Sequence, residues 1–319
     1  MVVAGLLLLA FAADRFVTAA ARLSHHWGMS PVLVGALIVG MGTSAPELLV
    51  SALAAAKGEV DLALGNAVGS NVANVTMVLG GTAMLAPLAG NLAVLKREGA
   101  AMFVAVLVLA AMLWDLQITR LEGSVLLLGM VVAAWLIVRW ARLDKQSGAT
   151  EDGEHGGDAV RPAVEIGLGA LSLGFTLVGA ELLVRGGTSL AESMGVGSAF
   201  IGMTLVAVGT SLPELATSIA GIRQGEHDMV LGNVVGSNLF NALAVAGLGG
   251  ALAPGPVDPG FQLGAVAMVL CSALAGFLAI TGRELVRWEG LVLLGGFAGY
   301  VWLSYDPSLI QLAIAAITR

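Results

Sequence analysis

The chain has 319 residues, of which 57% are hydrophobic and only 12% are charged, with a net charge of −7 and a mean hydropathy of +0.91. Soluble domains carry about 25% charged residues, so this composition excludes an ordinary soluble protein. An acidic chain without a basic cluster also argues against a nucleic-acid partner. Apolar runs of about 20 residues recur along the chain and predict bilayer-crossing helices, since barrel strands would alternate in polarity. We therefore expect an all-α polytopic membrane protein.

Ten transmembrane helices are expected, five on each side of one long polar segment. That segment, residues 141–163, is too short and too polar to form a core, so we interpret it as a flexible linker. It separates a first five-helix repeat, residues 1–140, from a second, residues 164–319. The expected spans lie at roughly 2–21, 31–56, 60–86, 98–114, 121–140, 164–186, 198–222, 228–252, 261–281 and 288–305.

The distribution of Lys and Arg residues predicts the orientation of these spans. Cytoplasmic loops carry an excess of both residues. The excess falls on the cytoplasmic side when both termini are placed outside and the linker 141–163 is placed inside. We therefore expect both termini outside the membrane and the linker in the cytoplasm.

A hexapeptide in the second span, Gly42-Thr43-Ser44-Ala45-Pro46-Glu47, returns as Gly209-Thr210-Ser211-Leu212-Pro213-Glu214 in the seventh. The offset, 214 − 47 = 167, also relates Asp14 to Glu181 and Asn66 to Asn233, so the chain is an internal duplication. Five spans per copy is an odd number, so the two copies are expected to be inverted in the membrane. Inverted repeats place a substrate near the midplane, at the interface between the copies.

Glu47 and Glu214 each fall about midway along an expected span. An ionised carboxylate at that depth is costly without a partner and is by default a functional candidate. A protonated carboxyl group that only bridges helices explains one such residue more easily than two at matched positions. Neither span offers Lys or Arg at the same depth, so we expect a bound cation to supply the opposite charge.

Pro46 and Pro213 lie directly before the two glutamates. Proline removes a backbone N–H group and displaces the carbonyl four residues earlier. We therefore expect interrupted helices with carbonyl groups freed at residues 40–43 and 207–210. Carboxylates, hydroxyls and carbonyls are hard oxygen ligands, which suit Ca²⁺ and Na⁺ rather than soft metals.

The helix that follows each motif carries a serine and an asparagine four residues apart, on one face. These pairs are Ser70 with Asn74 and Ser237 with Asn241. Their oxygens could complete a coordination shell, or the pairs could form hydrogen bonds between helices packed through small residues. Asn66 and Asn233 are interpreted as packing or capping residues.

With both motifs and their spacing established, the chain resembles the calcium/cation antiporter superfamily, and specifically the prokaryotic sodium/calcium exchangers. The resemblance covers all ten expected spans and implies four central cation sites, in the inner membrane of a prokaryote. It implies that the two glutamates are carboxylates shared between these sites. Further oxygens would come from each motif and from the helix that follows it. Asparagine at position 241, where some relatives have Asp, argues weakly against potassium dependence. The implied ligands are Glu47, Glu214, Thr43, Thr210, Ser44, Ser211, the backbone of Gly40 and Ala207, Ser70, Ser237, Asn74 and Asn241.

These features predict a secondary antiporter that exchanges Na⁺ for Ca²⁺ by alternating access, with the first and sixth spans sliding across a fixed core. A Ca²⁺/H⁺ exchanger that uses the same two glutamates is the alternative. A cation channel fits the broken repeats less well, and an intramembrane hydrolase lacks a His or Lys within a span. We expect no enzymatic activity and no cofactor, with the two ions and the bilayer as the partners of a monomer.

Overall fold

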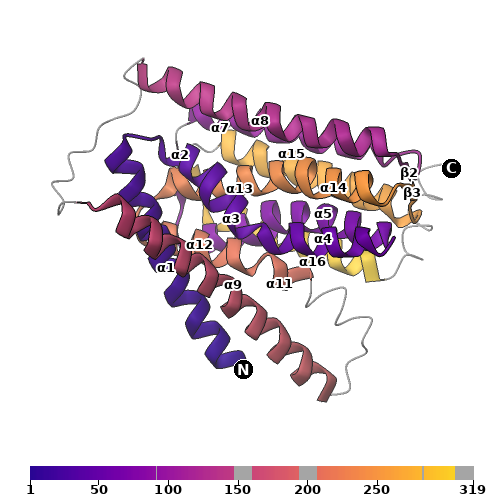
Figure 1. Ribbon diagram of the computed structural model, residues 1–319, viewed down its shortest axis with the longest axis horizontal. Coiled ribbons are helices and arrows are strands. Elements are labelled where there is room, and N and C mark those ends of the chain that lie inside the picture. The colour runs from indigo at the N-terminus through magenta and orange to yellow at the C-terminus, as the bar shows by residue number, and fades with distance from the viewer. Residues whose placement is uncertain (91, 147–159, 194–206, 282–283, 306–319) are drawn as a thin grey trace.

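The computed structural model describes residues 1–90, 92–146, 160–193, 207–281 and 284–305, and these are mostly helical (Figure 1). Three helical segments of the described residues have the wider π-helical turn and are labelled η. The elements up to the linker are α1 (Val2–Trp27), α2 (Pro31–Val34), η1 (Gly35–Gly40), α3 (Met41–Thr43), α4 (Ala45–Ala56), α5 (Val60–Ala73), η2 (Asn74–Val78), α6 (Leu79–Leu85), β1 (Leu88–Ala89), α7 (Leu92–Met112), β2 (Gln117–Ile118) and α8 (Arg120–Gln146).

The elements after the linker follow the same order as those before it. They are α9 (Pro162–Ser193), α11 (Ala207–Thr210), α12 (Leu212–Arg223), α13 (His227–Leu239), η4 (Phe240–Val245), α14 (Ala246–Leu252), β3 (Gly255–Pro256), α15 (Gly260–Thr281), β4 (Glu284–Leu285) and α16 (Arg287–Tyr305). The bounds of α4, α6, β1 and β2 recur in α12, α14, β3 and β4 at the same offset, 214 − 47 = 167. The duplication read from the motifs therefore extends to local structure.

The four short strands pair between the two halves. β1 pairs antiparallel with β4, and β2 pairs antiparallel with β3. Leu88 lies opposite Leu285, and the residues equivalent to them, Gly255 and Ile118, also lie opposite each other. This reciprocal exchange is the pattern that a two-fold relation between the halves produces.

The motif helices are interrupted where the proline rule predicts. Ser44 separates α3 from α4, and the helices on either side of it are bent by 44°. Its backbone angles, φ −83° and ψ 11°, are close to those of Ser211, φ −89° and ψ 5°, which separates α11 from α12. Pro46 and Pro213 lie in the first turn of the helix that follows each break. The residues immediately before Ala207 lie outside the described residues.

Six described helices are long and apolar enough to cross a membrane, or seven if the bent pair is one span. Of the ten expected spans, 198–222 begins outside the described residues. The spans at 98–114 and 288–305 correspond to α7 and α16, whose first two turns carry charged residues, including Arg97 in α7 and Arg287 in α16. The number of spans therefore stays a prediction.

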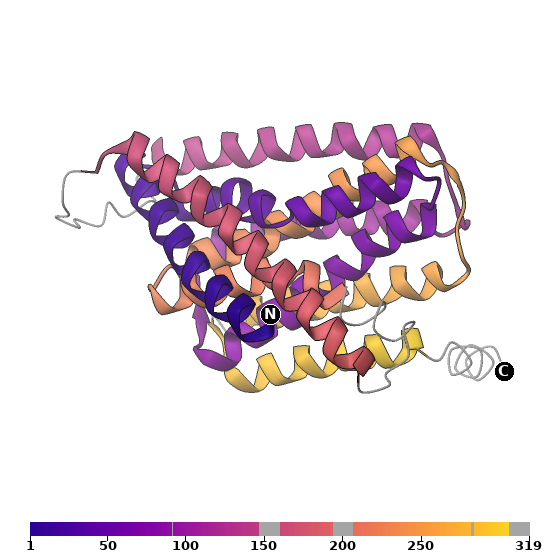
Figure 2. The ribbon, with the colours of Figure 1, turned by 60° about the horizontal axis from the view of Figure 1, so that its bottom comes forward.

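Helices α1 and α9, equivalent in the two halves, lie side by side and run obliquely to the other helices (Figures 1 and 2). They approach so closely that a Cβ atom on Gly179 would lie 2.6 Å from the backbone nitrogen of Leu9. Between α1 and α12, the Gln224 side chain donates hydrogen bonds to the carbonyl of Asp14 (2.9 Å) and to its carboxylate (3.1 Å). Helix α1 thus makes the larger contact between this pair and the rest of the molecule, and α9 makes smaller contacts with α3, α11 and α12.

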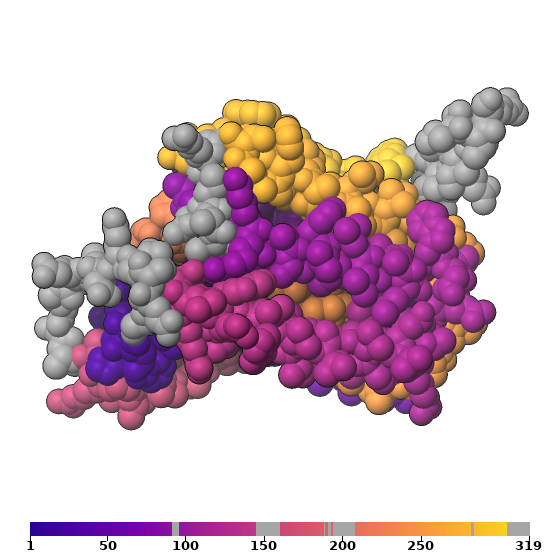
Figure 3. Space-filling model, turned by 90° about the horizontal axis from the view of Figure 1, so that it is seen from above, coloured from indigo at the N-terminus to yellow at the C-terminus, as the bar shows by residue number. Residues whose placement is uncertain are grey.

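The interior of the molecule is formed by α5, η2, α13 and η4. The helical run from His227 to Leu252 is buried along its whole apolar window, whereas only 28% of the corresponding window of α15 is buried. Helix α8 extends across the face seen in Figure 3, beside the C-terminal helices. A Cβ atom on Gly236 would lie 2.1 Å from the carbonyl oxygen of Ala36, so only glycine permits the contact of α13 with η1. This contact brings the two motif regions together.

Candidate cation site

The two matched carboxylates meet in the interior. Glu47 lies in the first turn of α4 and Glu214 in the first turn of α12, and their exposed fractions are 0% and 1%. They are close enough to interact electrostatically, and the hydroxyl of Ser70 faces the carboxylate of Glu47. The first turn of a helix favours negative charge, but two buried like charges still require a neutralising group.

A hydrogen bond from the first motif reaches the second glutamate. The Ser44 hydroxyl, at the break between α3 and α4, donates to Oε1 of Glu214 at 2.7 Å. Its equivalent, the buried hydroxyl of Ser211, has no hydrogen-bond partner among the described residues. The two motif serines therefore differ in their contacts, although their motifs match in sequence.

Several buried polar atoms in the same region have no hydrogen-bond partner in the described part of the chain. Such atoms are rare in folded proteins, and each costs about 1–3 kcal/mol or more when charged. A bound cation would occupy the free lone pairs of the oxygen atoms. The atoms are both carboxylate oxygens of Glu47, Oε2 of Glu214, the hydroxyl of Ser211 and both amide atoms of Asn74 and of Asn241.

The carbonyl of Gly40 differs from the expectation that proline would free it. It accepts the backbone N–H group of Ser44 at 3.0 Å, and the hydroxyls of Thr43 (3.3 Å) and Ser237 (3.2 Å) donate to the same oxygen. Proline displaces the carbonyl four residues earlier, which for Pro46 is that of Gly42, so the carbonyl of Gly40 keeps its backbone donor. This oxygen is thus at the junction of the two halves but already has donors.

Three further expected ligands belong to the two motif segments, and their contacts differ. Thr43 is buried near the carboxylate of Glu214, and its hydroxyl donates to the carbonyl of Val39 at 3.0 Å. Thr210 is half-buried and takes part in an interaction within the chain. Ala207 begins α11, and the segment before it lies outside the described residues.

Asn66 and Asn233 hold the motif helices in place. The Asn66 amide donates to the carbonyl of Glu47 (2.9 Å) and to the hydroxyl of Ser51 (2.9 Å). Asn233 donates to the carbonyl of Glu214 (3.4 Å) and to the hydroxyl of Ser218 (3.0 Å). Their interpretation as packing residues agrees with these contacts.

Ser51 and Ser218 were not among the expected site residues. They are equivalent at the repeat offset, since 218 − 51 = 167, and each lies four residues after its glutamate on the same helix face. A search for every polar pair that recurs at this offset would have found them. They support the asparagines that position the carboxylates rather than contributing free oxygens.

The fold and this site define a class: a multi-pass helical membrane protein with two carboxylates buried at the junction of duplicated halves. A family model described as "Sodium/calcium exchanger protein" matches residues 1–139 and 164–305. The chain therefore belongs to the sodium/calcium exchanger family, which confirms the resemblance read from its two motifs. It is accordingly an antiporter of a family that exchanges cations, including Ca²⁺.

Three similar proteins cover nearly the whole chain. CaxA of Alkalimonas amylolytica is 39% identical over 96% of this chain and 98% of its own length. The sodium/calcium exchanger MaX1 of Methanosarcina acetivorans is 28% identical over 93% of this chain and 95% of its own. Among solved structures, the sodium-calcium exchanger NCX_Mj soaked with Na⁺ and Sr²⁺ matches with a TM-score of 0.79 at 29% identity, covering 93% of this chain and 95% of that one.

Proposed function

We propose that this protein exchanges Na⁺ for Ca²⁺ across a prokaryotic inner membrane, and that the ions bind between Glu47 and Glu214. The observation that carries the proposal is the pair of matched, buried carboxylates surrounded by polar atoms without partners. Ca²⁺ takes six to eight oxygen ligands, and carboxylate, hydroxyl and amide oxygens are all of the required kind. The names of the similar exchangers agree with these two ions.

Charge balance explains why the two ions compete. One Ca²⁺ neutralises both carboxylates, and at least two Na⁺ ions are needed to do the same. Because the ions would use overlapping oxygens, a site filled with Na⁺ excludes Ca²⁺. An exchange of more than two Na⁺ for one Ca²⁺ would move net charge across the membrane.

Alternating access would follow from ten spans arranged as two inverted five-helix repeats. The reciprocal pairing of β1 with β4 and β2 with β3 supports a two-fold relation between the repeats. Helix α1 packs against α12, but its equivalent α9 makes no comparable packing against α4 within the described residues. The two equivalent repeats would thus have different arrangements in one molecule. If each repeat adopted the arrangement of the other, the site would open to the opposite side of the membrane.

The decisive experiment is uptake of ⁴⁵Ca²⁺ into proteoliposomes loaded with Na⁺, with the pH clamped by buffer and an ionophore. We expect uptake that requires the outward Na⁺ gradient and that is lost in Glu47→Gln. Uptake that does not depend on the Na⁺ gradient but is driven by a pH gradient would contradict Na⁺ coupling. That result would favour the Ca²⁺/H⁺ exchanger, in which the same two carboxyl groups carry protons.

A further inference from the structure

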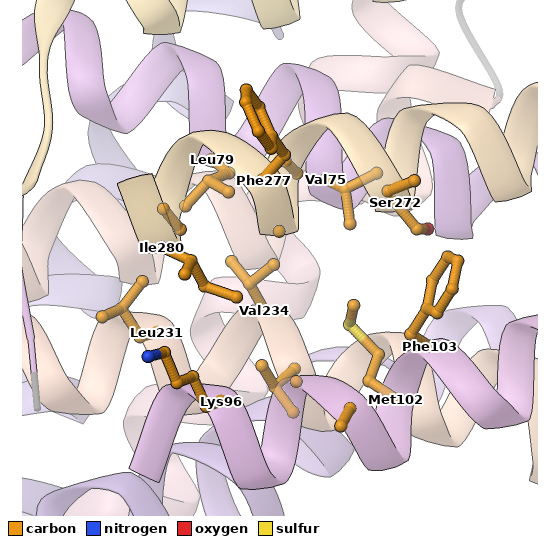
Figure 4. A pocket seen from close by; sticks show the side chains of 17 residues that line it. Val75, Leu79, Lys96, Met102, Phe103, Leu231, Val234, Ser272, Phe277 and Ile280 are labelled. Carbon is orange, nitrogen blue, oxygen red and sulfur yellow. The ribbon is translucent and has the colours of Figure 1, made fainter. Parts of the chain in front are cut away.

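A cavity of about 320 Å³ lies between α7 and α15, outside the cation site. Its floor is formed by η2 and α13, through residues that include Val75 and Val234. Figure 4 shows Lys96 at one end, near Leu231 and Ile280, and Ser272 at the other, near Phe103. The cavity therefore runs along the two helices rather than toward the two glutamates.

The walls of the cavity are apolar except at the two ends. Lys96 and Ser272 carry the only polar side-chain groups among the described residues that line it. Ser272 is 2% exposed and lies at the inner end, whereas Lys96 is exposed and forms no ion pair with the described residues. A ligand would therefore need a long apolar part and an anionic group at the exposed end.

The cavity lies beside apolar side chains on the surface of the molecule. Phe277 and Ile280, which line it from α15, are 63% and 40% exposed, as expected for side chains that contact lipid. Along α7 the lining runs from Lys96 to Phe103, which is about two helical turns or roughly 10 Å. Lys96 lies near the start of α7, where a long cationic side chain reaches the membrane surface.

We propose that this cavity binds one acyl chain of an anionic glycerophospholipid, and that Lys96 holds the phosphate group. The apolar walls match the chain, and the Lys96 ammonium group, which forms no ion pair with the part of the chain that the structure describes, matches the negative headgroup. The occupant is a bilayer phospholipid because apolar surface side chains border the cavity and the cation lies at the expected depth of the headgroups.

A lipid in this cavity would contact the helices that carry the cation site. Val75 is adjacent to Asn74 in η2, and Val234 is adjacent to Asn233 in α13. Met102, which also lines the cavity, accepts a hydrogen bond from the amide of Asn238 at 3.6 Å. The bound chain is therefore expected to hold η2 and α13 in place and to increase the rate of exchange.

The binding test is native mass spectrometry of the detergent-purified protein, titrated with phosphatidylglycerol or with phosphatidylcholine of the same acyl chains. The wild type is expected to retain phosphatidylglycerol about fivefold more tightly, since one cation near the surface contributes about 1 kcal/mol. Lys96→Gln should remove this preference. Arg120→Gln, at an exposed cation elsewhere, should retain it.

A second variant fills the cavity without disturbing the fold. A Cβ atom on Gly276, which lines the cavity, meets no atom within 4 Å, so Gly276→Leu would occupy the space of the acyl chain. Gly295 in α16 is equally unobstructed but does not line the cavity, so Gly295→Leu is the matched control. We expect retention of either lipid to fall in Gly276→Leu and to stay unchanged in Gly295→Leu.

Two results would overturn the proposal: an unchanged headgroup preference in Lys96→Gln, or unchanged lipid retention in Gly276→Leu. Retention of a free fatty acid with displacement of phosphatidylglycerol would also reject the phospholipid. A Ca²⁺ binding assay on the same samples separates this test from the exchange mechanism. Failure of the lipid site would leave Ca²⁺ binding intact, whereas a wild type that binds no Ca²⁺ would reject the proposed cation site whatever the lipid result.

Discussion

At the scale of single residues, the two carboxylates should dominate ion binding. In Glu214→Gln, one negative charge would remain for a divalent cation, and the loss of a close opposite charge in a partly polar interior is worth about 4 kcal/mol or more. We expect Ca²⁺ affinity to fall at least about 100-fold, as measured by isothermal titration calorimetry. Glu284→Gln, at an exposed glutamate in β4, is the matched control and should bind normally. Normal affinity in Glu214→Gln would reject the shared-carboxylate site.

The two motif serines should differ in their effect on stability in the ion-free protein. Ser44 donates to Glu214, whereas Ser211 has no partner among the described residues. A hydrogen bond to a charged group contributes about 1.5–3 kcal/mol. We expect Ser44→Ala to lower the thermal unfolding midpoint and Ser211→Ala to leave it nearly unchanged. Equal effects of the two substitutions would mean that the site is symmetric in solution.

At the scale of elements, much could be predicted from the repeat, but some features could not. The matched motifs predict the breaks at Ser44 and Ser211, because proline has a local and known effect on a helix. The wider turns of η1, η2 and η4 depend on packing between distant segments, as where Gly236 meets Ala36. The pairing of the short strands and the donors to the Gly40 carbonyl arise in the same way. None of these leaves a local pattern in the sequence.

The attachment of α1 to α12 leads to a prediction about the opposite state. Gln224 donates to Asp14 in the observed arrangement, and the residues equivalent to them are Lys57 and Glu181. If the halves exchange arrangements, Lys57 should contact Glu181 as Gln224 leaves Asp14. We expect Lys57→Glu or Glu181→Lys alone to slow ⁴⁵Ca²⁺ exchange severalfold, and the combined substitution to restore it.

Disulfide trapping checks the same prediction, in a background with Cys271→Ser. A cysteine pair at Asp14 and Gln224 should form a cross-link in the observed arrangement, and a pair at Lys57 and Glu181 only in the opposite one. Conditions that raise the yield of one cross-link should lower the yield of the other. If both yields rise and fall together, the two contacts do not alternate.

At the scale of the whole molecule, the orientation in the membrane can be tested along one helix. Helix α8 has 27 residues, which at about 1.5 Å per residue is about 40 Å and exceeds the roughly 30 Å of a bilayer core. Arg120 at its start and Arg142 near its end are both exposed. The excess of Lys and Arg expected on the cytoplasmic side predicts that Arg142 lies inside and Arg120 outside.

Single cysteines at these two positions, in the Cys271→Ser background, should therefore react from opposite sides of the membrane. A membrane-impermeant maleimide should label Arg120→Cys in intact cells. It should label Arg142→Cys only after the cells have been opened. Because α8 is one continuous helix, labelling of both cysteines in intact cells would mean that it does not cross the membrane, and an odd number of spans per repeat would fail. The reverse pattern would keep the inverted repeats but place the linker outside.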